Sequence, residues 1–530
     1  MIAVVGESGS GKSVTALSIL KLLDKKANIQ GGILFSPANE PEVNLIQASE
    51  KVMQKIRGNK ISMIFQEPMT SLNPAYTCGD QVMEALIQHK KISKKEAAQK
   101  TLQLFEQVQL PNPARMLHRY PHEISGGQKQ RVMIAMAMCC NPELLIADEP
   151  TTALDVRVQK SILELIKSLQ IKNNMSVMLI THDLGLVASV ADEIIVMYKG
   201  EIVEKGGAES VLKNPAHAYT RALLACRPTP ANKGKRLSVL SDFLDTGQSS
   251  NLHITAEDRQ QTVINPLETV LKVEDLTVQF PVSQNIFGRP KAYFKAVDQV
   301  SFSVHKNETV GLVGESGCGK TTLGRSILRL IEPSAGKVWL NGKDIAQIPE
   351  NDLRIIRKDL QIVFQDPYGS LNPRIRIGDA IAEPLQWHGI EPNKKNRREK
   401  VVQLLEDVNL SADHFNRYPH EFSGGQRQRI CIARALALAP KFIIFDESVS
   451  ALDVSVQAQV LNLIHELKAD YGFTCLFISH DLSVVHYISD RILVMQAGKI
   501  VESGTADEVF FHPQNSYAKE LIASIPGLAL

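Results

Sequence analysis

Two glycine-rich loops end in a lysine and a hydroxyl side chain, at the spacing of a phosphate-binding loop. They span residues 6–13 and 314–321, each between an apolar run and a predicted helix. Glycines let backbone N–H groups converge on phosphates, and the start of the helix adds a favourable dipole. Two copies in this context favour nucleotide binding over turns that bind nothing. The expected phosphate-binding residues are Gly6, Ser8, Gly9, Gly11, Lys12 and Ser13, and Gly314, Ser316, Gly317, Gly319, Lys320, Thr321 and Thr322.

Paired carboxylates follow two further apolar runs, at Asp148-Glu149 and Asp446-Glu447. Apolar runs of this kind are typical of buried parallel strands. We expect each aspartate to hold Mg²⁺ through water, and each glutamate to polarise an attacking water molecule. The lysines should reach the β- and γ-phosphates, and the hydroxyls should complete the metal site. The predicted metal-site residues from these motifs are Ser13, Asp148, Thr321 and Asp446.

A histidine follows each aspartate by 34 positions, at His182 and His480, after another apolar run. A histidine at the end of a buried strand is most often a satisfied core residue. The equal spacing in both copies instead favours a contact with the γ-phosphate that orients the water.

The chain is an internal repeat of a whole domain. Lys12 and Lys320 are 308 positions apart, but the residues after them are offset by 299 and then by 298 positions. An insertion near residues 36–54 of the first copy accounts for the difference. A tandem fusion therefore explains the sequence better than a solenoid.

A Ser-Gly-Gly-Gln stretch precedes each carboxylate pair, at residues 125–128 and 423–426, and opens a predicted helix. Taken with the loops, carboxylates and histidines, this pattern resembles the ATP-binding-cassette ATPases, twice and over nearly the whole length. The resemblance implies an α/β fold of two tandem P-loop ATPase domains, each with a helical subdomain. It also implies ATP and Mg²⁺ as ligands.

The resemblance implies further roles. Gln66 and Gln365 should contact Mg²⁺ and the attacking water, and Phe280 should stack on adenine, with Tyr293 or Phe294 as weaker candidates. The Ser-Gly-Gly-Gln stretch should bind the γ-phosphate of the nucleotide held by the other cassette, with a simple helix cap as the alternative. One site would then join Lys12 to Ser423, and the other Lys320 to Ser125. The residues concerned are Ser125, Gly126, Gly127 and Gln128, and Ser423, Gly424, Gly425 and Gln426.

The expected domains are residues 1–226 and 267–530, joined by a flexible linker over residues 227–266 that is rich in Pro, Lys, Ser and Asn. Only five residues precede Gly6, whereas about 45 with strand patterns precede Gly314. The first domain is therefore expected to lack its N-terminal β-subdomain segment. A start further upstream is favoured over a natural truncation.

Composition gives no support for a nucleic-acid-binding, disulfide-rich or membrane-spanning protein. Lys and Arg total 59 against 57 Asp and Glu, which gives no reason to expect nucleic acid or a membrane surface as a partner. The seven cysteines lack the spacing of a zinc or disulfide framework, and we expect neither these nor an iron–sulfur site. No apolar run is long enough to cross a bilayer.

Both copies continue with Ser-Leu-Asn-Pro after the glutamine, at residues 71–74 and 370–373. This tetrapeptide resembles the peptide and nickel importer branch. It implies an ATPase for dipeptides or oligopeptides, with glutathione second. The implied partners are two membrane permeases and an extracytoplasmic binding protein, at the cytoplasmic face of the inner membrane. A ribosome-associated tandem cassette is the rival class, but such proteins usually carry a long, charged helical linker.

Overall fold

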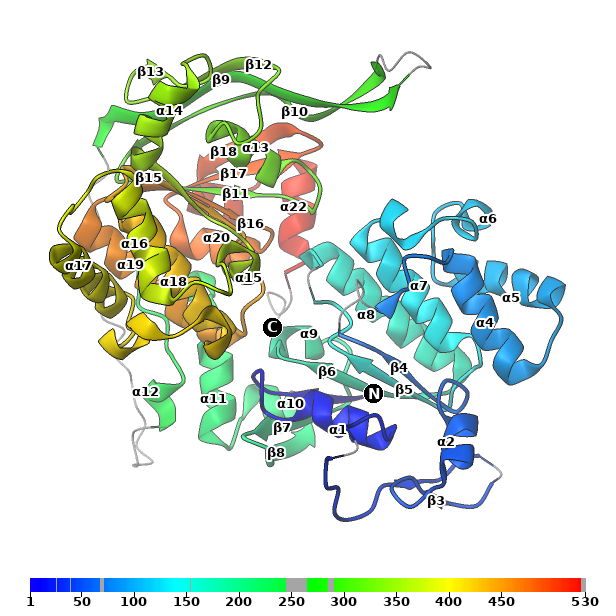
Figure 1. Ribbon diagram of the computed structural model, residues 1–530. Coiled ribbons are helices and arrows are strands. Elements are labelled where there is room, and N and C mark those ends of the chain that lie inside the picture. Colours follow the sequence, from blue (N-terminus) through cyan, green and yellow to red (C-terminus); the bar gives the residue numbers. More distant parts are fainter. Residues whose placement is uncertain are drawn as a thin grey trace. The chain divides into compact units, whose positions relative to one another are not determined.

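The computed structural model describes residues 1–24, 26–38, 40–66, 71–152, 154–244, 265–284 and 290–525. Contacts between α-carbons divide these residues into two units. The first contains residues 1–224 and 240–244, and the second contains residues 225–239 and 265–525. Figure 1 shows the elements of both units, coloured along the chain.

Each unit is built on a six-stranded sheet with the same strand order. In the first unit the order is β4-β5-β6-β1-β7-β8, and in the second it is β14-β15-β16-β11-β17-β18. All neighbours are parallel except the last pair of each sheet. The strands of the first sheet are β4 (Ile61–Ile64), β5 (Leu144–Asp148), β6 (Ser176–Thr181), β1 (Ile2–Val5), β7 (Glu193–Tyr198) and β8 (Glu201–Gly207). Those of the second are β14 (Leu360–Val363), β15 (Phe442–Asp446), β16 (Thr474–Ser479), β11 (Thr309–Val313), β17 (Arg491–Gln496) and β18 (Lys499–Thr505).

Strand β15 shows why its apolar run forms a central strand. All five of its residues are buried. Phe442 and Ile444 belong to one apolar cluster, and Ile443 and Phe445 belong to another. Because successive side chains point to opposite faces, the sheet is covered on both sides. The predicted α/β fold with two tandem P-loop domains is confirmed.

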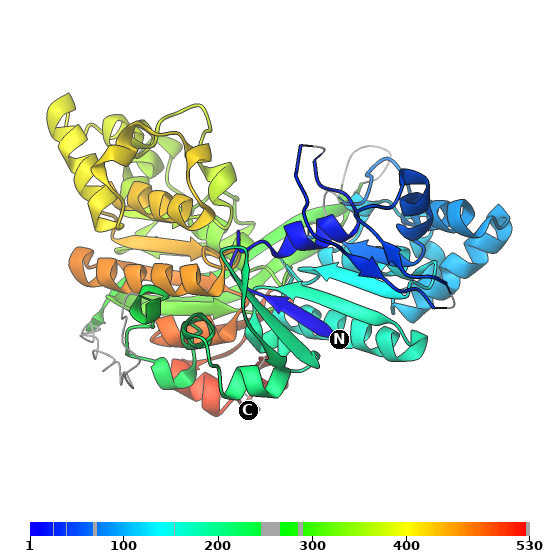
Figure 2. The same cartoon turned by 90° about the horizontal axis from the view of Figure 1, so that it is seen from below.

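A helical subdomain follows the β4 or β14 strand in each unit. Two consecutive helices form the first part of this subdomain in each unit, over residues 78–107 and 377–407. Lys91 takes a left-handed conformation (φ 53°) at the break in the first unit, and Ser93 caps the next helix. Figure 2 shows the yellow helices of the second unit at the end away from its red carboxy-terminal helices. The main helices of the subdomain in the first unit are α4 (Cys78–Lys90), α5 (Lys94–Gln107) and α7 (Gly126–Met138). Those in the second unit are α16 (Ile377–Trp387), α17 (Lys394–Asp407) and α18 (Gly424–Leu436).

The units differ in their antiparallel sheets. The second unit has a four-stranded sheet, ordered β10-β9-β12-β13. In the described part of the first unit, the antiparallel sheet consists of β2 (Leu34–Phe35) and β3 (Val43–Asn44). The four strands of the second unit are β9 (Asn265–Gln284), β10 (Pro290–Lys306), β12 (Ala335–Leu340) and β13 (Lys343–Asp344).

The expected flexible linker differs from the structure in its first part. Residues 225–239 cluster with the second unit, and Leu237 and Val239 are buried. These two apolar side chains stand among lysines, prolines and serines, so composition alone indicated a solvated segment. Residues 245–264 of the expected linker lie outside the described residues. The predicted domain limits themselves stay a prediction.

Candidate nucleotide sites

Each phosphate loop connects a central strand to a short helix, as its sequence predicted. The loops run from β1 to α1 (Lys12–Ile19) and from β11 to α13 (Lys320–Ile327). Gly11 and Gly319 precede the helices with φ of 100° and 111°, a region open to glycine. A Cβ built on Gly6 or Gly314 would lie 2.2 Å from a backbone carbonyl oxygen. The loops therefore depend on glycine for their close backbone approach.

The lysine of each loop is buried and donates to its own loop. Lys12 Nζ lies 2.7 Å from the carbonyl oxygen of Gly6 and 2.8 Å from that of Glu7. Lys320 Nζ makes the same contacts with Gly314 and Glu315, at 2.8 and 2.9 Å. These contacts hold the ammonium group against the loop. Phosphate oxygens of a bound nucleotide would replace the loop carbonyl oxygens as its acceptors.

The hydroxyl after each lysine meets the aspartate at the end of the neighbouring strand. Ser13 Oγ donates to Asp148 Oδ1 at 3.1 Å, and Thr321 Oγ1 donates to Asp446 Oδ1 at 3.0 Å. Both aspartates are almost fully buried. A hydroxyl and a carboxylate at this distance form an oxygen donor set of the kind that Mg²⁺ prefers.

The glutamate, histidine and glutamine of each copy also come together. In the first unit Glu149 Oε2 lies 3.2 Å from Gln66 Nε2 and 3.3 Å from His182 Nδ1. In the second, Glu447 Oε2 lies 3.1 Å from Gln365 Nε2 and 3.4 Å from His480 Nδ1. The ends of parallel strands meet at one edge of the sheet, which explains how residues far apart in sequence converge.

The two glutamates are held as carboxylates. Burial alone would raise the pKa of Glu149, but the hydrogen bond and charge of His182 outweigh it and hold the pKa at about 2. The pKa of Glu447 is likewise held below its ordinary value, because His480 and Lys320 outweigh burial. Burial raises the pKa of both Asp148 and Asp446. At neutral pH each glutamate can therefore accept a hydrogen bond from water.

Backbone strain coincides with these glutamates. Glu149 and Glu447 have φ of 45° and 47°, a left-handed conformation that costs energy for a residue with a side chain. Their N–H groups donate to the carbonyl oxygens of Ile180 and Ile478, both at 2.9 Å. The strand pairing thus fixes an unfavourable conformation at the residue predicted to act as the base.

The Ser-Gly-Gly-Gln stretches begin α7 and α18 with a capping box. The serine hydroxyl accepts from the glutamine N–H at 3.3 Å, and the glutamine side chain accepts from the serine N–H at 3.1 Å, in both copies. A Cβ on Gly425 would lie 2.2 Å from Val456. This glycine therefore serves helix packing. Among the described residues of the second unit, no hydrogen bond or ion pair joins Ser423 to Lys320.

The predicted adenine-stacking residue lies in β9. Phe280 pairs in register with Phe294 of β10, and both side chains are partly exposed. The backbone of β10 also approaches the second phosphate loop, because a Cβ on Gly319 would lie 2.1 Å from the carbonyl oxygen of Ala296. The stacking role of Phe280 stays a prediction.

Two tyrosines contact the phosphate loops. The buried Tyr219 and Tyr517 accept hydrogen bonds from the N–H groups of Glu7 and Glu315, both at 2.9 Å. They lie in α11 (Ala218–Ala225) and α22 (Ser516–Ala523). The sequence signal was their 298-position offset, the same as that of the histidines. In the first unit Thr152 adds a hydrogen bond to Glu149 at 2.9 Å.

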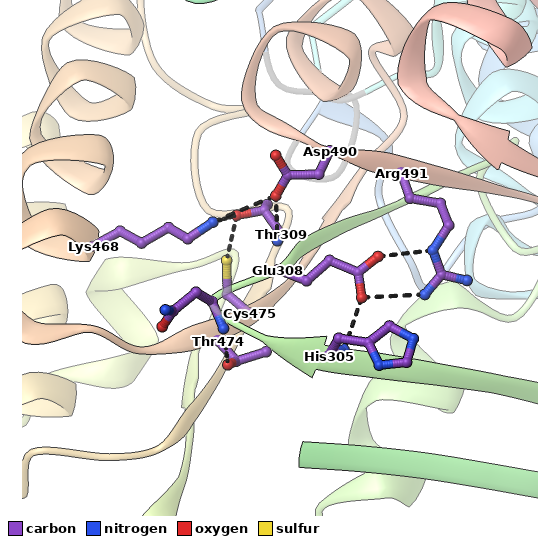
Figure 3. Close-up of polar contacts among 9 residues, drawn as sticks. His305, Glu308, Thr309, Lys468, Thr474, Cys475, Asp490 and Arg491 are labelled. Carbon is purple, nitrogen blue, oxygen red and sulfur yellow. Dashed lines mark hydrogen bonds and ion pairs between the residues drawn. The ribbon is translucent and has the colours of Figure 1, made fainter. Parts of the chain in front are cut away.

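A second polar cluster in the second unit lies at the other end of β11 (Figure 3). Arg491 Nε lies 2.8 Å from Glu308 Oε1. Lys468 Nζ donates to Thr309 Oγ1 at 2.7 Å, and the Thr309 N–H donates to Asp490 Oδ2 at 2.8 Å. These contacts join the start of β11 to helix α19 (Val454–Tyr471) and strand β17. The cluster is structural, since it satisfies buried polar groups at the edge opposite the phosphate loop.

Comparison with known proteins identifies the family of both halves of the chain. The sequence profile of the ABC transporter ATP-binding domain matches residues 1–152 and 297–450. The chain belongs to the ABC transporter family. It is 48% identical over 532 residues to the glutathione import ATP-binding proteins GsiA of Shigella sonnei (strain Ss046) and Escherichia coli (strain K12). The match covers 99% of this chain and 84% of each relative.

Two further matches concern parts of this ABC ATPase. The profile of the oligopeptide/dipeptide transporter C-terminal region matches residues 203–242. The chain also resembles a solved ATP-binding cassette, a dimeric structure bound to ADP and Pi, with 26% sequence identity and a TM-score of 0.41. The match covers 44% of this chain and 98% of the solved chain. The predictions of tandem cassettes, nucleotide binding and ATP hydrolysis are confirmed by the family.

In the part of the chain that the structure describes, no helix is long and apolar enough to cross a membrane. No cluster of three His, Cys, Asp or Glu side chains suited to a metal ion occurs among the same residues.

Proposed function

We propose that this ABC ATPase powers the import of short peptides, a class that includes the tripeptide glutathione. The observation that carries the proposal is the match of a peptide-transporter C-terminal region to residues 203–242, at the end of the first cassette. The 48% identity with two glutathione import ATP-binding proteins supports the same class. The Ser-Leu-Asn-Pro stretches after both glutamines agree with it.

The residues of each site fit ATP with Mg²⁺. Glycine supplies the backbone cradle, and lysine supplies a cation that already binds two carbonyl oxygens. When bound, Mg²⁺ neutralises negative charge on the β- and γ-phosphates. Ser13 with Asp148, and Thr321 with Asp446, would hold it. Gln66 and Gln365 are the remaining proposed ligands.

Glu149 and Glu447 are the proposed bases for the attacking water. Each carboxylate stays ionised at neutral pH because its histidine lowers its pKa. His182 and His480 orient the carboxylate and are proposed to contact the γ-phosphate. Hydrolysis then needs positioning and charge neutralisation more than covalent chemistry.

Two composite sites are proposed. A nucleotide on Lys12 would be completed by Ser423, and one on Lys320 by Ser125. The capping boxes support this, because they leave the serines and first glycines exposed at the start of a helix, where anions bind well. Closure on ATP and reopening after hydrolysis would supply the mechanical step.

The proposed partners are two integral-membrane permeases and an extracytoplasmic substrate-binding protein, with this chain at the cytoplasmic face of the inner membrane. The partners would select the solute. A ribosome-associated function is the alternative, and a single purification separates the two.

The test is purification of the native chain from detergent-solubilised cells, followed by uptake assays with labelled dipeptides, oligopeptides and glutathione. We expect two polytopic permeases to co-purify, and uptake of one of these solutes to require Lys12 and Lys320. Ribosomal proteins without permeases would overturn the importer proposal. Co-purifying permeases without uptake of any peptide would overturn the solute class.

A further inference from the structure

Residues 225–239, here called the arm, follow the first cassette in sequence but belong to the second unit. Cys226 and Leu237 are fully buried and form part of the main apolar cluster of the second unit. The short helical turn Pro230–Asn232 contacts helix α20 (Leu482–Ile488). The arm therefore has both apolar anchors and a defined path.

Three hydrogen bonds hold the backbone of the arm against the second cassette. Asn462, buried in helix α19, accepts from the N–H of Leu237 at 3.0 Å and donates to its carbonyl oxygen at 2.9 Å. Tyr487 of α20 donates to the carbonyl oxygen of Lys235 at 3.0 Å and lies 3.3 Å from Asn462 Oδ1. A side-chain amide that pairs with both polar groups of one residue fixes the register of the bound segment.

A charged contact extends this surface. Lys233 Nζ lies 2.7 Å from Asp507 Oδ1, and His486 Nε2 lies 2.8 Å from the same oxygen. Asp507 belongs to helix α21 (Ala506–Phe511). Three helices of the second cassette thus contribute to the binding of the arm.

The first cassette carries different residues at the equivalent positions. The 298-position offset aligns Asn462 with Glu164, His486 with Ala188 and Tyr487 with Ser189. A glutamate cannot donate to a carbonyl oxygen when ionised, and neither alanine nor serine reproduces the phenol. The surface that binds the arm is therefore a property of the second cassette.

We propose that the arm is a recognition element that binds the Asn462–Tyr487–Asp507 surface of the second cassette. It would tie the two cassettes of one chain together independently of nucleotide, and it would favour pairing of a first cassette with a second one. Two of the three helices, α19 and α20, are preceded by the capping residues Asp453 and Asp481, and Asp481 directly follows His480. The proposal does not depend on which solute is imported.

The test uses the full chain with a specific protease site placed within residues 248–264. After cleavage without nucleotide and with EDTA, we expect the two fragments to co-elute from a sizing column. Leu237→Asp should weaken their association by roughly tenfold or more, because it buries an unpaired charge. Glu164→Ala, on the equivalent helix of the first cassette, is the matched control and should leave association unchanged.

Separation of the wild-type fragments without nucleotide would overturn the proposal, and so would unchanged association of the Leu237→Asp fragments. A second measurement tests the proposal without any variant, in case Leu237→Asp folds poorly. In the uncut wild-type chain, the Leu237 amide should exchange with deuterium far more slowly than an unstructured peptide. Exchange at the unstructured rate would also exclude a bound arm.

Discussion

At the scale of single residues, the proposed role of the two glutamates as bases can be tested directly. We expect Glu447→Gln to retain ATP binding but to lower hydrolysis at its site by about 10²–10⁴-fold, the usual contribution of a general base. The amide keeps the shape of the side chain and its contact with Gln365, but cannot accept the proton. Single-turnover hydrolysis with trapped, labelled ATP measures the effect. Wild-type turnover would exclude Glu447 as the base.

Glu447 also predicts how stability depends on pH. Its pKa is lower in the folded protein, so ionised Glu447 stabilises the second cassette above its unfolded pKa. This contribution is lost as the pH falls through the folded value. Glu447→Gln should therefore lose less stability than wild type when the pH falls from 7 to well below 4.5, the ordinary value for a glutamate.

The tryptophans offer a selective measurement of that effect. The chain has two, Trp339 and Trp387, and both lie in the second unit. Urea unfolding followed by their fluorescence therefore reports the second cassette. Glu149→Gln, in the first cassette, is the control and should leave this transition unchanged at both pH values. Equal pH dependence of Glu447→Gln and wild type would contradict the assignment.

At the scale of elements, the carboxy-terminal helix of each cassette stabilises its phosphate loop. Tyr517→Phe should remove the hydrogen bond from the N–H of Glu315, at a cost of about 0.5–1.5 kcal/mol, the usual net contribution of one hydrogen bond. We expect weaker ATP binding at the second site, measured by titration with a fluorescent ATP analogue. Tyr471→Phe, at a tyrosine of helix α19, is the control for loss of a hydroxyl. Unchanged affinity in Tyr517→Phe would show that the contact does not support the loop.

The elements also show what the sequence could and could not predict. Apolar runs such as residues 442–446 predicted buried strands, because both faces of a parallel strand are covered. The sequence motifs assigned the loop lysine, the hydroxyl, the aspartate and the glutamate of each copy to one site. The structure brings Thr321 to Asp446 and Lys320 to Glu447. The position of the break at Lys91 could not be read from composition, because a left-handed residue other than glycine leaves little trace there.

Long-range contacts account for the other differences. The tyrosine hydroxyls and the arm depend on partners about 200 or more positions away, such as Tyr517 for Glu315 and Asn462 for Leu237. No local pattern specifies such a partner. The arm looked like a linker because its apolar anchors are few, although each of them is buried.

At the scale of the whole molecule, the two phosphate loops differ in the described residues that lie against them. Strand β10 approaches the second phosphate loop at Ala296 and pairs with the strand that carries Phe280. At the equivalent loop position of the first unit, a Cβ on Gly11 would meet only Met197 and Gly200, at 3.5 and 3.7 Å. Among the described residues of the first unit, no carbonyl oxygen lies as close to this position as that of Ala296 does to Gly319.

This difference between the surroundings of the two phosphate loops predicts that the two sites of this chain differ in their affinity for ATP. Lys12→Ala leaves the second site intact, and Lys320→Ala leaves the first, so the two variants separate the sites. We expect tighter ATP binding in Lys12→Ala, by about 5- to 150-fold if base stacking contributes about 1–3 kcal/mol. Combining Lys12→Ala with Phe280→Ala should lower that affinity to the level of Lys320→Ala, whereas Val282→Ala, at an exposed position of the same strand, serves as a control. Equal affinities in the two lysine variants would show that stacking on the second cassette adds nothing to binding.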